Sequence, residues 1–145
     1  MTSLSFPDIN TWLALATTEH VHSALARRWW DEETARIAFT RVTQLGFLRL
    51  VTTAAAMDGK PLSMNDAWRV YDRFFTDERV VFVPEPGQVE MRFRKFSSGQ
   101  TVSPKLWADA WLLAVADAAK GSLVTFDRAL ATRGARCLLS ADQDA

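Results

Sequence analysis

The fold is decided by residues 104–127, PKLWADAWLLAVADAAKGSLVTFD, in which a helical pattern leads into a short apolar run that ends in an acid. Pro104 follows Ser103 at the expected helix start, because serine caps helices and proline suits the first helical position. The helix is expected to run to about position 120, where Gly121 ends it. Residues 123–126 are apolar and partly β-branched, as is typical of a strand buried on both faces.

The same alternation continues outward from this stretch in both directions. Apolar residues spaced three or four apart predict further helices over residues 21–30, 42–50 and 63–75. Strands that alternate with helices indicate a parallel sheet covered on both faces, and no repeat or linker divides the chain. We therefore expect residues 1–145 to form a single α/β domain, with strands at 4–6, 36–40, 80–83, 123–126 and 137–139.

The composition limits the classes of partner. Lys and Arg together number 17, as do Asp and Glu, so no net charge draws the protein to nucleic acid or membrane. Binding to a polyanion must then come from local patches or from a metal. The single cysteine, Cys137, excludes an internal disulfide and a cysteine zinc cluster. We find no targeting segment or membrane-spanning stretch, so a cytoplasmic protein is expected.

Three aspartates are candidate site residues. Asp8 and Asp127 each follow an expected strand, and parallel strands bring such residues to the sheet edge where ligands bind. Each alone is readily explained as a helix N-cap, but two at one edge favour a site. Asp109 shares a helix face with aliphatic residues, which is costly for a carboxylate that is not paired, hydrogen-bonded or metal-bound. Three converging acids imply a divalent cation, and hard oxygen ligands favour Mg²⁺ or Mn²⁺ over zinc.

Four segments of the chain form a recognisable series: 8–10 (DIN), 41–50 (RVTQLGFLRL), 107–114 (WADAWLLA) and 123–128 (LVTFDR). They resemble the motifs of PIN domains, and their order and spacing are similar to those of the VapC toxin ribonucleases of bacterial toxin–antitoxin modules. The resemblance implies a three-layer fold whose central, mostly parallel sheet of about five strands is flanked by helices. It also implies a Mg²⁺- or Mn²⁺-dependent endoribonuclease, a cognate VapB-type antitoxin, an RNA substrate and a homodimer.

The resemblance also implies roles for particular residues. Asp8 and Asp109 match the principal metal-binding acids, and Asp127 matches a further acid that holds metal directly or through water. Asn10 and Thr125 match polar residues that support the site by hydrogen bonds. The expected reaction is attack on phosphorus by a water whose pKa the metal lowers, with no nucleophilic serine or cysteine.

Gln44 departs from the family pattern, which usually has an acid there. Its carbonyl oxygen brings no charge, so we expect weaker metal affinity, and one bound ion where two are possible. As a hypothesis, Gln44→Glu tightens Mn²⁺ binding. The alternative that Gln44 is a structural amide stays open at the level of sequence.

Other side chains have two interpretations each. Arg41 and Arg49 flank Gln44 and are candidates for contact with RNA or antitoxin, or for a surface ion pair. His20 and His22 are expected in a surface loop or cap, because two histidines so placed point in different directions. The six tryptophans are expected mostly in the core, and an exposed cluster would mark a subunit or antitoxin surface. The neighbours Trp29 and Trp30 cannot both face inward from one helix.

Two other functions stay open. An aspartate-based phosphoryl-transfer domain also has aspartates at strand ends, although it generally needs a second acid where Asn10 stands and a lysine, for which Lys105 is the candidate. The second open function is a catalytically weak PIN-like module that binds RNA or protein. The main reason to consider it is Gln44, which stands where the family usually has an acid. Metal-dependent cleavage of structured RNA separates that module from a nuclease.

Overall fold

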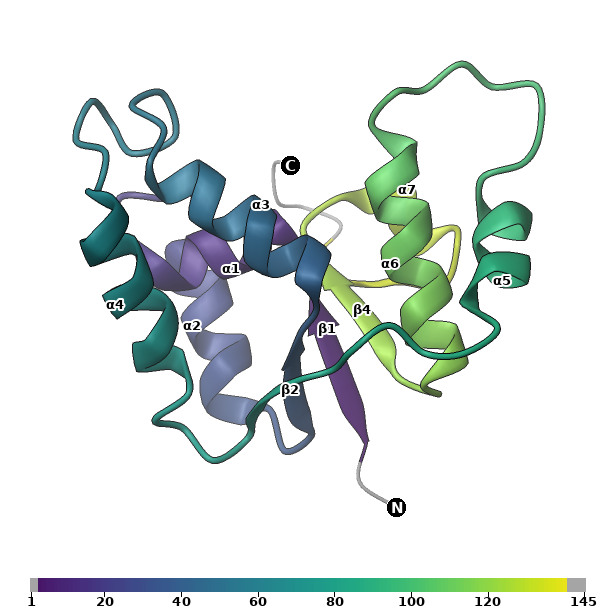
Figure 1. Cartoon of the computed structure of the whole chain (residues 1–145), viewed down its shortest axis with the longest axis horizontal. Coiled ribbons are helices and arrows are strands. Elements are labelled where there is room, and N and C mark those ends of the chain that lie inside the picture. Colours follow the sequence, from purple (N-terminus) through teal and green to yellow (C-terminus); the bar gives the residue numbers. More distant parts are fainter. Residues whose placement is uncertain (1–2, 141–145) are drawn as a thin grey trace.

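The computed structural model describes residues 3–140, and within them the chain forms a five-stranded parallel sheet with helices on both faces (Figure 1). The strand order is β3-β2-β1-β4-β5. The sheet therefore extends in opposite directions from β1 and β4, and the strand order reverses between these two. The parallel α/β fold expected from the sequence is confirmed, and its strands are β1 (Leu4–Pro7), β2 (Arg36–Phe39), β3 (Val80–Phe82), β4 (Ser122–Thr125) and β5 (Arg136–Cys137).

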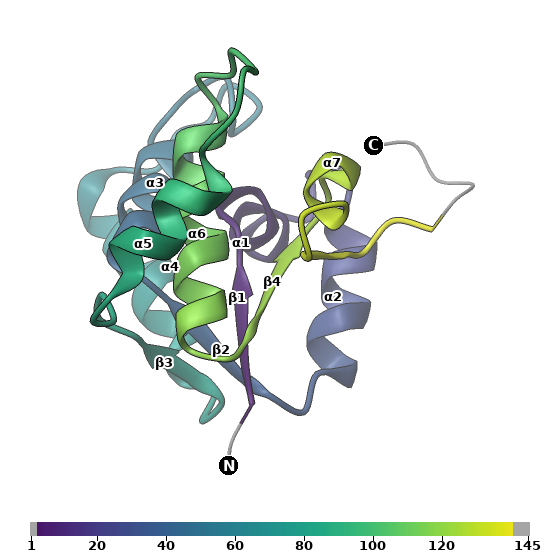
Figure 2. The same ribbon diagram turned by 90° about the vertical axis from the view of Figure 1, so that its right-hand side faces the viewer.

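Seven helices cover the sheet in the described part of the chain. Figure 2 shows α2 on the opposite side of β1 and β4 from α5 and α6. The helices are α1 (Ile9–Ala16), α2 (Ser23–Glu32), α3 (Arg41–Val51), α4 (Met64–Phe74), α5 (Val89–Phe96), α6 (Leu106–Ala118) and α7 (Arg128–Ala131). None of the helices within residues 3–140 is long and apolar enough to cross a membrane.

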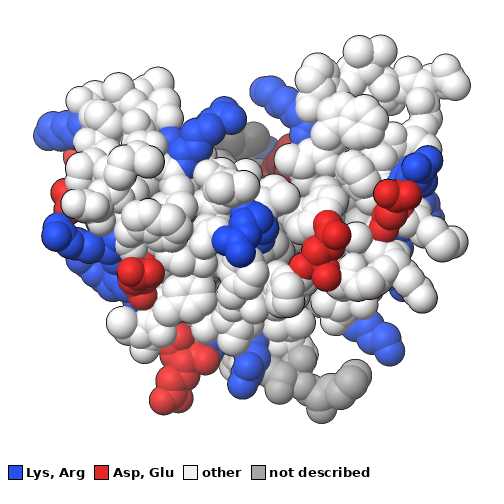
Figure 3. Space-filling model, in the orientation of Figure 1, with Lys and Arg blue, Asp and Glu red and all other residues white. Residues whose placement is uncertain are grey.

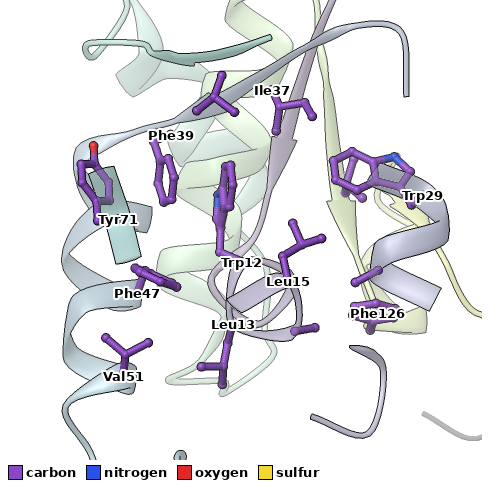
Figure 4. Close-up of a cluster of buried hydrophobic side chains, with 14 of the residues drawn as sticks. Trp12, Leu13, Leu15, Trp29, Ile37, Phe39, Phe47, Val51, Tyr71 and Phe126 are labelled. Carbon is purple, nitrogen blue, oxygen red and sulfur yellow. The ribbon is translucent and has the colours of Figure 1, made fainter. Parts of the chain in front are cut away.

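The core consists of two apolar clusters on the two faces of the sheet. Along β2, Ile37 and Phe39 belong to the cluster with α1 to α4, whereas Ala38 belongs to the cluster with α5 and α6. This follows from the two-residue period of a strand, and it explains why the strands are apolar at successive positions. Figure 4 shows Trp12 at the centre of the first cluster, where its ring stacks on Phe39 with 3.7 Å between ring centroids.

The helix α6 differs from expectation at both ends. It begins at Leu106 rather than Pro104, and it ends at Ala118. Lys120 rather than Gly121 takes the left-handed conformation, with φ of 57°. Gly121 is needed for another reason, because a Cβ there would lie 2.5 Å from the backbone oxygen of Leu4. The glycine thus permits close contact between the helix end and β1.

The helices α1 and α7 were not expected as elements. In α1, residues 11–15 are all buried, so the segment has no polar face from which a helical period could be recognised. The helix α7 has only four residues, too few to show a period.

The expectation that Trp29 and Trp30 cannot both face inward is wrong. Trp29 is buried, and Trp30 packs on Trp12 with 6.3 Å between ring centroids. The aromatic residues of α1 and α4 extend the cluster around the side of α2, so a second tryptophan on that helix also finds apolar contacts.

Candidate active site

Three acids from separate parts of the chain meet at the edge of the sheet where its strands end. Asp8 directly follows β1, Asp127 lies two residues after β4, and Asp109 stands in the first turn of α6. Since β1 and β4 are parallel neighbours at the reversal of strand order, Asp8 and Asp127 emerge where ligands bind in such sheets. The three acids line one pocket of about 550 Å³ together with Ile9, Asn10, Leu50, Lys105 and Phe126.

The surface is hollowed between the half of the molecule with α3 and α4 and the half with α5 and α6. Figure 3 shows acidic atoms recessed in this notch and basic side chains on both sides of it. A polyanion that approached the recessed acids would therefore first meet cations.

Hydrogen bonds fix the carboxylate of Asp8, which is buried. Its Oδ1 accepts from the backbone N–H of Thr11 at 2.9 Å and from the Thr11 hydroxyl at 2.7 Å. Its Oδ2 accepts from the hydroxyl of Thr125 at 2.6 Å. Burial raises the pKa of Asp8 more than these hydrogen bonds lower it. Only Oδ2 retains a lone pair for a ligand, so Asp8 would bind a cation through this one oxygen.

Thr125 connects two of the acids. Its hydroxyl donates to Asp8 and accepts from the backbone N–H of Asp127 at 2.9 Å. The side chain is fully buried. These contacts are those of a residue that supports the site by hydrogen bonds, which is the role the family resemblance gave to Thr125.

Asp127 is exposed and serves as the N-cap of α7. Its Oδ1 accepts from the backbone N–H of Ala129 at 2.9 Å. The N-cap interpretation of Asp8 and Asp127 is therefore correct, since Asp8 caps α1 in the same way. Capping occupies only one oxygen of Asp127, so it does not exclude a role in the pocket.

Asp109 has no hydrogen bond or ion pair with any residue between 3 and 140. Burial, followed by the charges of Asp8 and Asp127, raises the pKa of Asp109 to about 6. A carboxylate with both oxygens uncommitted and two like charges nearby is electrostatically unfavourable, and a bound cation would remove the penalty.

The donor set suits a hard divalent cation. The pocket offers carboxylate oxygens and contains no cysteine or histidine. Within residues 3–140, however, no three acidic, histidine or cysteine side chains lie close enough together to hold one ion. Mg²⁺ commonly retains several waters and is bound through one or two carboxylates, so a closed set of three is not required.

Gln44, Arg41 and Arg49 do not line this pocket. Gln44 is 7% exposed, accepts a hydrogen bond from Arg41 and lies near the hydroxyl of Tyr71. The Arg41 guanidinium also lies over the ring of Phe82, 4.8 Å from its centroid. The contacts of Gln44 are thus those of a structural amide, the second of its two interpretations. Arg49 is exposed, and its guanidinium has no partner among the described residues.

Lys105 is the cation that lines the pocket. It lies one helical turn before Asp109, and it forms no ion pair with a described residue. On sequence alone, Lys105 is a candidate only as the lysine of a phosphoryl-transfer domain. Lys105 precedes Asp109 by four residues at the start of a helix, and residues with this spacing lie on the same helix face. This spacing is the sequence signal that could have located Lys105 near the acids.

Asn10 also lines the pocket, and its side chain is hydrogen-bonded to a residue that does not line it. Its Oδ1 lies 2.9 Å from Nε2 of His20 in the loop between α1 and α2. The residue that contacts Asn10 is thus one that the sequence alone placed at the surface.

Comparison with known proteins gives consistent results. The PIN domain family profile matches residues 5–135. Ribonuclease VapC41 of Mycobacterium tuberculosis is 40% identical over 133 residues, which cover 88% of this chain and 91% of that protein. The crystal structure of VapC20 from the same species, described as a sarcin-ricin loop cleaving toxin, superposes with a TM-score of 0.65 over 90% of this chain and 95% of that one. Its sequence identity is 13%, so this likeness concerns the fold.

Proposed function

This chain belongs to the PIN domain family, among the VapC ribonucleases, and from that membership we propose that its acidic pocket is the active site of a toxin endoribonuclease. The observation that carries the proposal is the meeting of Asp8, Asp109 and Asp127 in one pocket within the span that the family profile covers. The reaction is hydrolysis of an RNA phosphodiester, in which water attacks phosphorus and the leaving oxygen takes a proton.

One or two of these acids would hold Mg²⁺ or Mn²⁺ directly, and the others would contact the ion through its bound waters. The ion would supply Lewis-acid polarisation of the phosphate and a bound water of lowered pKa. Asp109 is the acid with both oxygens uncommitted, whereas Asp8 is oriented by Thr11 and Thr125. Lys105, whose ammonium has no ion-pair partner in the part of the chain that the structure describes, would contact a phosphate oxygen at the pocket wall. Each of these side chains is in position before RNA binds, which lowers the cost of organising the site.

The Asp109→Asn variant tests the proposal. We expect RNA cleavage to fall by more than about 100-fold, because the least committed oxygen ligand loses its charge. Mn²⁺ binding measured by titration calorimetry should weaken in the same variant. Asp117→Asn is the matched control, because Asp117 is on the same helix but is exposed and paired with Arg92.

Circular dichroism of both variants should match that of the wild type. Retained cleavage by Asp109→Asn, in a preparation free of contaminating nuclease, would remove Asp109 from the active site. Absence of metal-dependent cleavage by the wild type would favour the alternative of a PIN-like module that only binds RNA or protein.

Gln44→Glu distinguishes the two interpretations of Gln44. If Gln44 acts near the metal, the added carboxylate tightens Mn²⁺ binding. If Gln44 is a structural amide, the new carboxylate pairs with Arg41 instead and titration calorimetry gives equal affinities. The absence of Gln44 from the pocket lining supports the second outcome.

We also propose a VapB-type antitoxin as partner, a homodimer as the assembled form and the cytoplasm as the location. Two tryptophans on separate helices are exposed, Trp68 on α4 to 47% and Trp107 on α6 to 59%, and exposed aromatic residues are typical of interaction surfaces. Light scattering of the purified chain tests the dimer. Co-purification with the product of a short upstream reading frame tests the antitoxin.

A further inference from the structure

His20 lies outside the acidic pocket but contacts one of the residues that line it. The loop between α1 and α2 places the ring beside Asn10, with Nε2 2.9 Å from Oδ1 of that residue. The expectation of a surface loop is met, but the ring is half-buried and both of its nitrogens are engaged.

The second nitrogen decides where the proton of His20 lies. The backbone N–H of His22 donates to Nδ1 of His20 at 3.0 Å. A nitrogen that accepts a hydrogen bond carries no proton, so in the neutral ring the proton is on Nε2. His20 therefore donates to Asn10. Burial, followed by the neighbouring His22, lowers the pKa of His20, which agrees with a neutral ring.

This donation fixes the orientation of the Asn10 carboxamide. Because Oδ1 accepts from His20, the Nδ2 amino group is the end left for the pocket that Asn10 lines. An amino group donates hydrogen bonds and does not coordinate a metal ion. Asn10 is thereby suited to a phosphate oxygen and unsuited to the cation.

Few side chains that line the pocket can donate a hydrogen bond to a phosphate oxygen. Its three carboxylates only accept hydrogen bonds when ionised, and the non-bridging oxygens of a phosphodiester also only accept. Besides Lys105, Asn10 is the polar side chain of the pocket lining that can donate. The loop that carries His20 is itself anchored, since the ring of His22 stacks on Phe126 with 4.5 Å between centroids.

We propose that His20 is a positioning residue for RNA binding: it holds the Asn10 carboxamide with its amino group toward the pocket, where that group donates to a phosphate oxygen. This inference rests on the proposed function, because it takes RNA to be the substrate of the acidic pocket.

RNA binding tests the proposal without requiring catalysis. In the Asp109→Asn background with chelator present, fluorescence anisotropy gives the Kd for a single-stranded RNA oligonucleotide. We expect His20→Ala to raise this Kd by about 10-fold, as for loss of one hydrogen bond to a charged group. His20→Gln should restore the Kd to within about 3-fold of the reference, since its side-chain amide can donate to Asn10.

Two comparisons separate positioning from a general structural effect. Glu19→Gln alters an exposed neighbour in the same loop and should leave the Kd unchanged. In an Asn10→Ala background, His20→Ala should have no further effect, because the residue that it orients is gone. An equal loss with and without Asn10, or failure of His20→Gln to restore binding, would overturn the proposal.

The tautomer is tested on the wild-type chain, so the result does not depend on the folding of any variant. A long-range proton–nitrogen correlation spectrum should show a protonated Nε2 and an unprotonated Nδ1 for His20. A proton on Nδ1 would overturn the positioning role. If the wild type cleaves RNA in the presence of metal but His20→Ala binds RNA normally, this inference alone is overturned. If the tautomer is as expected and the effect of His20→Ala on the Kd depends on Asn10, but the wild type does not cleave RNA, only the proposed function is overturned.

Discussion

At the scale of single residues, an aspartate after a parallel strand serves two purposes here. Asp8 and Asp127 both cap the helix that follows them, and both line the pocket. A carboxylate has two oxygens with two lone pairs each, so a cap does not exhaust its capacity. Asp109 differs because its carboxylate has no hydrogen bond or ion pair with any residue from 3 to 140. Its ionisation should therefore respond most strongly to pH, and its substitution should have the largest effect.

Asp109→Asn should stabilise the metal-free protein at neutral pH. The folded-state pKa of about 6 lies above the ordinary value of 3.8. Between those values the folded state binds more protons than the unfolded state, so the free energy of unfolding falls as the pH rises through this window. Asparagine carries no charge and so removes the cost of ionising a half-buried carboxyl. The free energy of unfolding at pH 7 should therefore rise by about 1–2 kcal/mol, after allowance for solvent screening.

Urea unfolding with chelator at pH 7 and pH 4 checks this prediction. The variant and the wild type should have nearly equal stability at pH 4, where Asp109 is largely protonated in the folded protein. The Asp117→Asn control should show no such dependence on pH. Equal stability of the Asp109 variant and the wild type at both pH values would contradict the electrostatic penalty.

Lys105→Ala should weaken RNA binding through loss of a phosphate contact. For a single strand, each lost contact lowers the slope of log affinity against log salt by about 0.7. Titrations of RNA at several salt concentrations measure that slope. Lys95→Ala is the control, since Lys95 is exposed on α5 and does not line the pocket. An unchanged slope for Lys105→Ala would exclude a phosphate contact by this lysine.

At the scale of elements, the distance between α3 and α1 depends on one glycine. A Cβ at Gly46 would lie 2.1 Å from Cδ1 and 2.6 Å from Cγ1 of Ile9. Ile9 follows Asp8 and itself lines the pocket. The packing of α3 on α1 is therefore linked to the position of the acid that ends β1.

Gly46→Ala should destabilise the protein despite the higher helix propensity of alanine. The propensity gain is about 1 kcal/mol, whereas overpacking against a β-branched side chain costs about 1–3 kcal/mol. We expect a net loss of up to about 2 kcal/mol in urea unfolding. Adding Ile9→Ala to Gly46→Ala should abolish the clash, so the two substitutions together should cost less than the sum of their separate effects. Strict additivity would mean that the contact does not limit helix packing.

At the scale of the whole molecule, charge and topology act together. The chain has no net charge, so its attraction for RNA depends on where charges lie. The reversal of strand order between β1 and β4 gathers acids at one edge of the sheet, with basic side chains on both sides of the notch (Figure 3). Binding of a divalent cation there should therefore affect the stability of the entire fold.

Mg²⁺ or Mn²⁺ should raise the Tm of the wild type, and a chelator should reverse the change. A ligand at a hundredfold excess over its Kd adds about 2.7 kcal/mol, which corresponds to roughly 5–10 °C for a domain of this size. Asp109→Asn should show a much smaller rise. Scanning calorimetry with and without the cation provides the measurement, and an unchanged wild-type Tm would count against a metal in this pocket.

Much of the fold and part of the site could be predicted from sequence because the relevant signals are local. Residues 104–127 specify a helix, a buried strand and the acid after it, and a parallel sheet then brings Asp8 and Asp127 to one edge. Local patterns were insufficient where burial is complete, as in α1, and where the helix start depends on its surroundings, as at Leu106.

Only the tertiary structure decided which side chains meet in the pocket. Spacing along the chain cannot show that Gln44 contacts Tyr71 instead of lining the pocket, or that His20 donates to Asn10. Periodicity specifies the face of an element on which a residue lies, because it reflects backbone geometry. Contacts between faces depend on strand order and packing distance, which arise from interactions among residues far apart in the chain. The sequence by itself therefore determined most of the helices and strands and the acids of the pocket, and tertiary packing determined which side chains these acids contact.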